Sequence, residues 1–331
     1  AEQRDFGDSG PCHVNVACPE GDGWENEVRA TARILVGGVA HCSGTLLNNC
    51  ANDGTPYFLT AKHCVDGLSP GLFLVQFNYQ SPTCSPTQDG PTDQSIAGTT
   101  LLALSDSTDR ALLLLNDEPL PEHNVYYAGW DATLSQSQTG VGIHHPSGDV
   151  KKISTYAQGA GAIELFDSWK VWHVYFWESG AIESGSSGSG LWDESHRLIG
   201  QLFGGQQYCD ALFDAYYGRL DHEFDGLRPW LGDCGSVLNG WDPAVGVSDG
   251  VSLYDALEVW PVPADDLLFV EAPESADHLS LFDALGRCVY EQRIVGGARH
   301  SVSTDGLPSG TYLLRLRMEG DLYTRSVCVA H

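Results

Sequence analysis

Three short segments carry the residue types needed for nucleophilic catalysis. They are TAKHC at 60–64, DRALLLLN at 109–116 and GSSGSG at 185–190. A serine hydroxyl is a weak nucleophile until an imidazole accepts its proton, and that imidazole needs a carboxylate to hold its tautomer. His63, Asp109 and Ser187 supply these groups in the order His, Asp, Ser. We therefore predict that the three residues form a catalytic triad.

Ser187 is the preferred nucleophile among the serines of its segment because of its glycine neighbours. Gly185 lies two residues before it and Gly188 follows it. Such a backbone can turn the N–H groups of Gly185 and Ser187 toward a developing oxyanion. Taken alone, the Gly/Ser run is also typical of a flexible loop, and His63 beside Cys64 of a structural histidine. Their joint order and spacing favour the catalytic interpretation.

The elements that must position these residues are mainly strands. Thirty-eight glycines and 16 prolines separate short apolar segments, which is typical of an all-β protein. A helical face is expected only within 221–231, while 235–250 reads as a linker. Alternation in TYLLRLRM, at 311–318, predicts a half-buried strand beyond it. We therefore predict a first domain over 1–234, the linker 235–250 and a second domain over 251–331.

Composition restricts the class of protein and its compartment. A net charge of −27 disfavours nucleic-acid binding, and no apolar run approaches the roughly 20 residues needed to cross a bilayer. Ten cysteines without paired CxxC spacing indicate disulfides and an oxidising compartment. The polar N-terminal stretch has no signal-peptide pattern, so we expect that a targeting segment has been removed from an exported protein.

The first domain resembles the bacterial lysyl endopeptidases, which are secreted trypsin-fold serine proteases. The likeness runs from about Cys12 to Leu231. It is carried by CPEGDGW (18–24), SGTLLNNCANDGTPYFLTAKHC (43–64), AGWD (128–131), IHHP (143–146), GSSGS (185–189) and LIGQLFGG (198–205). This resemblance implies a chymotrypsin-like double β-barrel with His63, Asp109 and Ser187 in the cleft between the barrels.

The same resemblance implies three disulfides, Cys12–Cys209, Cys18–Cys84 and Cys42–Cys64. Four cysteines have no counterpart in the family pattern, and four cysteines allow three connectivities. Because Cys288 and Cys328 both lie beyond the expected linker, we favour the pairs Cys288–Cys328 and Cys50–Cys234.

The resemblance also indicates where a peptide substrate would bind. Leu202, Phe203 and Gly204 would form the strand edge that pairs with an extended peptide. A bound lysine needs a buried carboxylate. The trypsin-like position for it is Ala181, so the acid must come from elsewhere. Asp214, near the Tyr-Gly-Arg stretch at 217–219, is the closest match, although one residue farther from that stretch than in the family, and Asp210 is the second candidate.

Two features near the expected site depart from the best-known family members. Phe203 replaces a histidine, and Lys62 stands where His or Asn is frequent, so pH optimum and pocket shape do not transfer. His144 and His145 could be mistaken for metal ligands, but adjacent residues of a strand point to opposite sides. We predict no metal and no cofactor.

The second domain resembles the C-terminal sorting domain of the type IX secretion system of Gram-negative bacteria. The likeness is carried by VWPVPADDLLFV (259–270), LSLFDALGRCVYEQRI (279–294) and LPSGTYLLRLRMEG (307–320). It implies a small β-sandwich that contacts the secretion machinery, with the protein secreted or placed at the cell surface. A generic β-sandwich binding module is the alternative.

Together these features predict a monomeric, secreted serine endopeptidase that cuts polypeptides on the carboxyl side of lysine. Only four of the 17 basic residues are lysines, which weakly favours this preference because such an enzyme would select against its own exposed lysines. One alternative keeps the triad with a broader Lys/Arg preference. Another is a non-catalytic surface adhesin on a protease scaffold, which the complete set of three catalytic groups disfavours.

Overall fold

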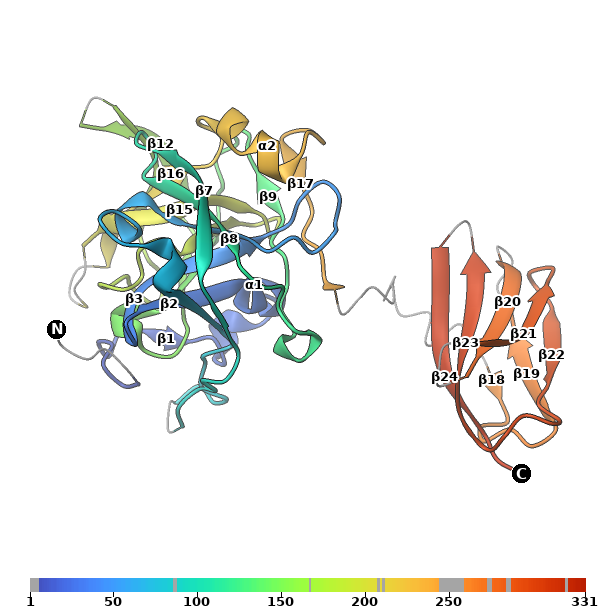
Figure 1. Ribbon diagram of the computed structural model, residues 1–331. Coiled ribbons are helices and arrows are strands. Elements are labelled where there is room, and N and C mark those ends of the chain that lie inside the picture. Colours follow the sequence, from blue (N-terminus) through green and yellow to red (C-terminus); the bar gives the residue numbers. More distant parts are fainter. Residues whose placement is uncertain are drawn as a thin grey trace. The chain divides into compact units, whose positions relative to one another are not determined.

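The chain divides into two compact units after Pro243. The computed structural model describes residues 6–85, 88–166, 168–206, 209, 212–243, 259–272, 276–283, 287–318 and 321–331. Strands dominate both units (Figure 1). No helix in the described ranges is long and apolar enough to cross a membrane.

The first sheet of unit 1 has seven antiparallel strands and its own apolar core. In spatial order the strands are β6 (Ser95–Ala97), β5 (Phe73–Phe77), β2 (Thr31–Val36), β3 (Val39–Leu47), β4 (Tyr57–Ala61), β8 (Arg110–Leu115) and β7 (Thr99–Ser105). The apolar runs Tyr57–Thr60 and Ala111–Leu115 form adjacent strands, and most of their side chains are buried on the two faces of the sheet. The register between them decides where His63 and Asp109 lie.

The second sheet of unit 1 has ten strands. Along its main path they are β1 (Val14–Asn15), β11 (Lys152–Tyr156), β10 (Gly140–His144), β14 (Gly190–Asp193), β15 (Leu198–Gly205), β16 (Phe213–Arg219), β13 (Trp169–Phe176) and β12 (Ala160–Leu165). Two short strands extend it: β9 (Trp130–Asp131) pairs with β15, and β17 (Val237–Leu238) pairs with β9. The loop between β13 and β14 carries Ser187.

Helices contribute little to unit 1. Helix α1 (Glu25–Ala30) precedes β2, and α2 (Arg228–Leu231) follows β16. The helix expected over 221–231 is therefore shorter than predicted, because Glu223 has a left-handed backbone and a 3₁₀ turn covers Phe224–Gly226. Its predicted apolar face is nevertheless buried: Phe224, Leu227 and Leu231 all belong to the core of unit 1.

The predicted start of the linker at 235 is wrong. Strand β17 pairs with β9, and Trp241 exchanges two backbone hydrogen bonds of 2.8 Å with Tyr127. The rings of Trp241 and Tyr127 also pack with their centroids 5.2 Å apart. Residues up to 243 therefore belong to unit 1, and the rest of the predicted linker, 244–250, lies outside the described residues.

Unit 2 is a small β-sandwich of two sheets around one core. The three-stranded sheet has the order β18 (Val259–Trp260), β19 (Leu267–Glu271), β22 (Arg299–Ser303). The four-stranded sheet has the order β21 (Cys288–Arg293), β20 (Ala276–Phe282), β23 (Gly310–Met318), β24 (Asp321–Val329). The alternation predicted for β23 is confirmed, because Tyr312, Leu314 and Leu316 are buried in the core.

Four disulfides join parts of unit 1 that are distant in sequence: Cys12–Cys209, Cys18–Cys84, Cys42–Cys64 and Cys50–Cys234. These are four of the five predicted pairs. The fifth, Cys288–Cys328, is wrong, and both thiols are free. Their strands, β21 and β24, are the two outer strands of the four-stranded sheet. Three strand spacings separate them by about 14 Å, whereas bridged Cα atoms lie within roughly 7 Å.

The role of 236–243 can be tested by comparing two truncations that both retain Cys234. A chain ending after Pro243 should keep the stability of unit 1. A chain ending after Gly235 should lose about 1–3 kcal/mol of unfolding free energy, because it loses the β17 pairing and the packing of Trp241 on Tyr127. Urea denaturation followed by tryptophan fluorescence or circular dichroism measures both, and equal midpoints would mean that this segment is a linker after all.

Candidate active site

His63 and Asp109 are brought together by the register of β4 and β8. Ala61, the last residue of β4, lies opposite Arg110, the first of β8. His63 follows in a 3₁₀ turn, Lys62–Cys64, and Asp109 immediately precedes β8 with a left-handed φ of 52°. The N–H of Lys62 donates to the Asp109 carbonyl at 2.8 Å. The two side chains therefore meet at the same end of the sheet.

The Asp109 carboxylate contacts His63 at two points. Its Oδ1 accepts a hydrogen bond from the His63 backbone N–H at 2.9 Å, and its Oδ2 lies 2.6 Å from the ring Nδ1. Asp109 is 3% exposed, whereas the His63 side chain is 40% exposed. A buried carboxylate on Nδ1 favours the tautomer with its proton there, which leaves Nε2 able to accept a proton.

The loop that carries Ser187 packs against the strands next to His63. The N–H of Ser43, in β3, donates to the Ser187 carbonyl at 2.8 Å, and the adjacent Cys42 is disulfide-bonded to Cys64. Gly188 fits there because it lacks a side chain: a Cβ would lie 2.7 Å from the Ala61 nitrogen. Glycine also suits its φ of 81°. The segments of His63 and Ser187 thus lie side by side.

Burial separates Ser187 from Ser186 and Ser189, whereas Ser184 is partly exposed like Ser187. Ser186 and Ser189 are fully buried, whereas Ser187 is partly exposed. Among the residues that the structure describes, the N–H groups of Gly185 and Ser187 have no hydrogen-bond acceptor. Gly185 adopts a φ of 95°, a conformation that a residue with a side chain rarely adopts. Two unclaimed donors beside an accessible hydroxyl can bind an oxyanion.

The predicted peptide-binding edge lies where β15 continues beyond its pairing with β14, and it is open on that side only after Leu202. Strand β14 pairs with β15 only as far as Gln201, whereas β16 continues along Leu202 and Gly204 to Gly205, with a register shift at Phe203. Leu202 is buried and bonded to the Ser187 loop: it accepts from the Gly188 N–H and donates to the Ser189 carbonyl, each at 2.8 Å. The edge is therefore fixed relative to the candidate nucleophile.

Two aromatic side chains border this edge, and the sequence did not predict that the second of them, Trp169, would lie there. The ring of Phe203 stands edge-on to His63 with centroids 6.2 Å apart, and Trp169 packs on Phe203 at 4.4 Å. Trp169 begins β13, far from the recognised motifs in sequence. Only the pairing of β13 with β16, and of β16 with β15, places it here.

Asp214 already has a partner in the structure. Its Oδ1 lies 2.7 Å from Nε2 of His173, and its side chain is 35% exposed. The His173 ring stacks on Tyr216 at 4.7 Å and contacts Tyr175 at 3.8 Å. Asp214 has a left-handed φ of 62°, next to the fully buried Ala215. Asp210 lies outside the described residues.

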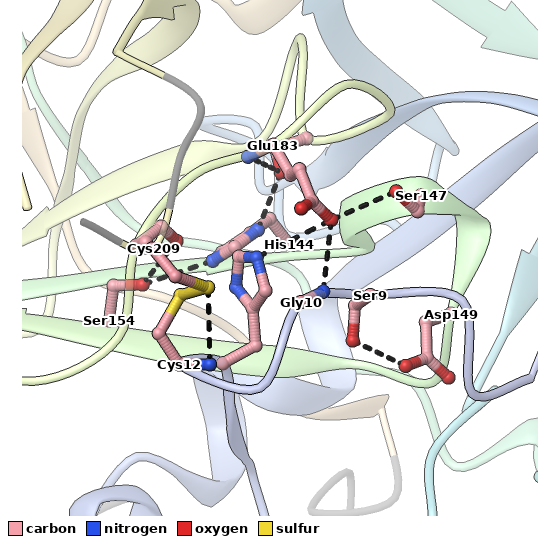
Figure 2. Close-up of a disulfide and its surroundings, with 12 residues drawn as sticks. Ser9, Gly10, Cys12, His144, Ser147, Asp149, Ser154, Glu183 and Cys209 are labelled. Atoms are coloured by element: carbon pink, nitrogen blue, oxygen red, sulfur yellow. Dashed lines mark hydrogen bonds and ion pairs between the residues drawn. A yellow bond between two sulfur atoms is a disulfide. The ribbon is translucent and has the colours of Figure 1, made fainter. Parts of the chain in front are cut away.

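The N-terminal segment is attached to the loops that carry Asp149, Glu183 and Cys209 (Figure 2). Besides the Cys12–Cys209 disulfide, Asp149 accepts from the Gly7 N–H at 2.8 Å and from the Ser9 hydroxyl at 2.5 Å. Glu183, four residues before Ser187, accepts from the Ser147 hydroxyl at 2.9 Å and lies 3.6 Å from His13. Contacts with Ser147 and His13 hold the pKa of Glu183 below its usual value despite the opposing effect of burial.

Two other sets of polar side chains bear on the electrostatics and on metal binding. Lys62 is paired with Asp66 at 3.0 Å and Asp106 at 3.2 Å, so its charge beside His63 is compensated. In the described part of the chain, two groups of three potential metal ligands occur. One consists of His63 with the disulfide-bonded Cys42 and Cys64, and the other of exposed side chains in unit 2, Asp265, Asp266 and His331. A disulfide sulfur is no thiolate, so the first group is not a metal centre.

The two largely antiparallel sheets of unit 1, with the His63–Asp109 pair on one and the glycine-flanked Ser187 in a loop of the other, define the chymotrypsin-like class of protein. Within this class, the chain belongs to the family described as "Lysyl endopeptidase, C-terminal domain", whose pattern matches residues 6–218. Residues 258–330 match a "Secretion system C-terminal sorting domain". The second match indicates a protein that is secreted or carried to the cell surface.

Individual proteins are similar to about three fifths of the chain. Lysyl endopeptidase from Pseudomonas aeruginosa is 34% identical over 223 residues, which cover 62% of this chain and 48% of that protein. The chain therefore spans about half the length of this relative. Among solved structures, human heparin binding protein has 16% identity and a TM-score of 0.45, covering 63% of this chain and 94% of that one. The MamO protease domain of Magnetospirillum magneticum has 12% identity and a TM-score of 0.41, with coverages of 61% and 97%.

Proposed function

We propose that this protein is a secreted serine endopeptidase in which Ser187 attacks the scissile carbonyl. The observation that carries the proposal is the two-point contact of Asp109 with His63, beside the loop of the accessible Ser187. His63 Nε2 would take the Ser187 proton as the Oγ–C bond forms, and would then give it to the leaving amine as the C–N bond breaks. Water would hydrolyse the acyl-enzyme by the same route in reverse.

The N–H groups of Gly185 and Ser187 would stabilise the oxyanion of the tetrahedral intermediate. Their lack of acceptors among the described residues supports this role, because donors that are not engaged elsewhere remain available to bind the oxyanion. The edge formed by Leu202, Phe203 and Gly204 would hold the substrate backbone as an added strand.

A preference for lysine before the scissile bond is the finer part of the proposal, and it assigns Asp214 as the acidic residue. Ala181 and Ala215 are buried and uncharged, so neither can pair with an ammonium. The Asp214 carboxylate is partly exposed, and its partner His173 is a side chain that a substrate ammonium could displace. Asp210 is the second candidate, and a broader Lys/Arg preference is the second candidate specificity.

Unit 2 is proposed to act in export and not in catalysis. Its match to a secretion sorting domain supports this division, as does a core that is separate from that of unit 1. Its partner would be the type IX secretion machinery.

The Ser187→Ala variant should lose roughly 10⁶ in turnover, because the attacking oxygen is removed while binding remains. A fluorophosphonate probe should label the wild type at Ser187 and leave this variant unlabelled, with peptide mapping by mass spectrometry as the readout. Ser189→Ala is the matched control, and its labelling should persist. Labelling of any other serine would show that the nucleophile is misassigned.

The Asp214→Asn variant should lose most of its cleavage after lysine, because the bound ammonium would be desolvated without a counter-charge. The fall in kcat/KM should correspond to a loss of about 3–5 kcal/mol of transition-state stabilisation. Reaction with a small neutral acylating agent should change little. His173→Gln, which keeps Asp214, should retain the lysine preference. Cleavage-site mapping in a denatured protein mixture separates Lys from Lys/Arg preference, and equal losses with both reagents would transfer the role to Asp210 or another acid.

Removing unit 2 should block export without impairing catalysis. In a host with type IX secretion, a chain ending after Pro243 should accumulate in the periplasm, while the purified fragment hydrolyses peptides at close to the full-length rate. Fractionation with an antibody against unit 1 measures the first effect. Normal release of the truncated chain into the medium would refute the sorting role.

A further inference from the structure

A fully buried histidine lies beneath the nucleophile loop and takes no part in the proposed chemistry. His144 ends β10, and both of its ring nitrogens contact hydroxyl groups. Nδ1 lies 2.7 Å from Oγ of Ser186, the residue before Ser187, and Nε2 lies 3.1 Å from Oγ of Ser154 in β11. Figure 2 shows His144 between Ser154 and the segment of Glu183.

The surrounding bonds fix the direction of each hydrogen bond. The Ser154 hydroxyl donates to the Ala181 carbonyl at 2.8 Å, so it accepts from His144 Nε2–H. The Ser186 hydroxyl accepts from the Glu183 N–H at 3.1 Å and has its own proton left to donate to Nδ1. One tautomer of a neutral imidazole therefore satisfies every group in the chain of hydrogen bonds.

The environment keeps this imidazole neutral. Burial lowers the pKa of His144 well below its usual value, and electrostatic interactions with His13 and Lys152 lower it further. A charged ring would have hydrogens on both nitrogens and could no longer accept the Ser186 proton. The network is therefore matched to a single protonation state.

Ser186 connects this hydrogen-bond network to the proposed oxyanion donors. Ser186 stands between Gly185 and Ser187, whose N–H groups are the proposed oxyanion donors. Its side chain is tied through His144 to β10 and β11, while the Gly185 carbonyl accepts from the Ser43 hydroxyl at 2.9 Å. The Ser187 N–H lies in the peptide plane that follows Ser186, whereas the Gly185 N–H lies in the plane that precedes Gly185. A rotation about the backbone torsions of Ser186 would therefore turn the Ser187 N–H relative to the Gly185 N–H and away from a common point.

We propose that His144 and Ser186 are positioning residues that hold the N–H groups of Gly185 and Ser187 at the geometry required by the tetrahedral intermediate. This inference rests on the proposed serine endopeptidase function. It predicts that the pair acts on the transition state and not on substrate binding.

The test uses the full chain with two variants of the network. In Ser186→Ala the proton donor to Nδ1 is lost with little change in volume, and in His144→Gln a shorter, neutral side chain retains a donor and an acceptor. We expect kcat per fluorophosphonate-titrated site to fall about 10- to 100-fold in Ser186→Ala, by analogy with lost or displaced oxyanion donors. His144→Gln should lose less.

Two further readouts distinguish positioning from a general structural role. The affinity for a peptide aldehyde, which forms a tetrahedral adduct, should fall by the same factor as kcat, while KM and the affinity for a product peptide stay within about twofold. The control is His145→Gln, because buried His145 instead contacts the Asp149 carbonyl at 3.0 Å. That variant should keep kcat per titrated site.

The outcomes separate this inference from the function on which it rests. A wild-type protein that is neither labelled at Ser187 nor able to hydrolyse peptides would refute the proposed function itself. An active wild type with unchanged kcat and aldehyde affinity in Ser186→Ala would overturn the positioning role alone. Parallel losses in KM and product binding, or equal effects in His145→Gln, would also overturn it.

Discussion

The two-point contact between Asp109 and His63 is the constraint on which the rest of the site depends. A single hydrogen bond to the ring would leave the imidazole free to swing about its side-chain torsions. Binding the backbone N–H of the same residue with the second carboxylate oxygen fixes the carboxylate relative to both the main chain and the ring. This geometry requires a buried carboxylate one residue before β8 and a turn immediately after β4, which the register of the two strands provides.

The second sheet holds the same aspartate from the other side. Gln201, in β15, donates through its amide to the Thr108 carbonyl at 2.7 Å and to the Asp109 carbonyl at 3.3 Å. Gly218, opposite Gln201 in β16, allows this approach because a Cβ there would lie 1.9 Å from the Thr108 oxygen. The glycine of the Tyr-Gly-Arg stretch is therefore needed for contact between the sheets, and the strand edge beside Ser187 is fixed to the strand that carries Asp109.

Sequence reasoning was most reliable where chemistry restricts residue type. His63 and Asp109 could be found because their roles admit few side chains, and four disulfides followed from the family pattern and the positions of the remaining cysteines. Trp169 and His173 could not be found, because an aromatic ring beside His63 and a partner for Asp214 depend on the pairing of β13 with β16. The prediction of Cys288–Cys328 was wrong for the same reason: the position of both cysteines beyond the linker gave no indication of the order of strands in the sheet.

The lysines of the chain illustrate the constraint on a lysine-binding pocket. Lys151 is fully buried and its Nζ donates to the Val28 carbonyl at 2.6 Å, with no ion pair among the described residues. Burial alone lowers its pKa to about 7, so near neutral pH much of its population is uncharged. The adjacent Lys152 lies 3.4 Å from Asp149, which opposes the lowering of its pKa by burial.

A substrate lysine in a pocket lined only by residues such as Ala181 and Ala215 would be buried without a counter-charge, as Lys151 is among the described residues. Its uncharged form would then bind better than its charged form. A preference for the charged side chain at neutral pH therefore requires a carboxylate close to the substrate ammonium. Such a group would stabilise the charged form, as Asp149 does for Lys152. Among the described residues of β16 that precede Ala215, only Asp214 offers one. If Asp214 is that carboxylate, as proposed, a substrate ammonium would replace His173 as its partner, and the carboxylate would lose less hydration on binding than one that starts fully solvated.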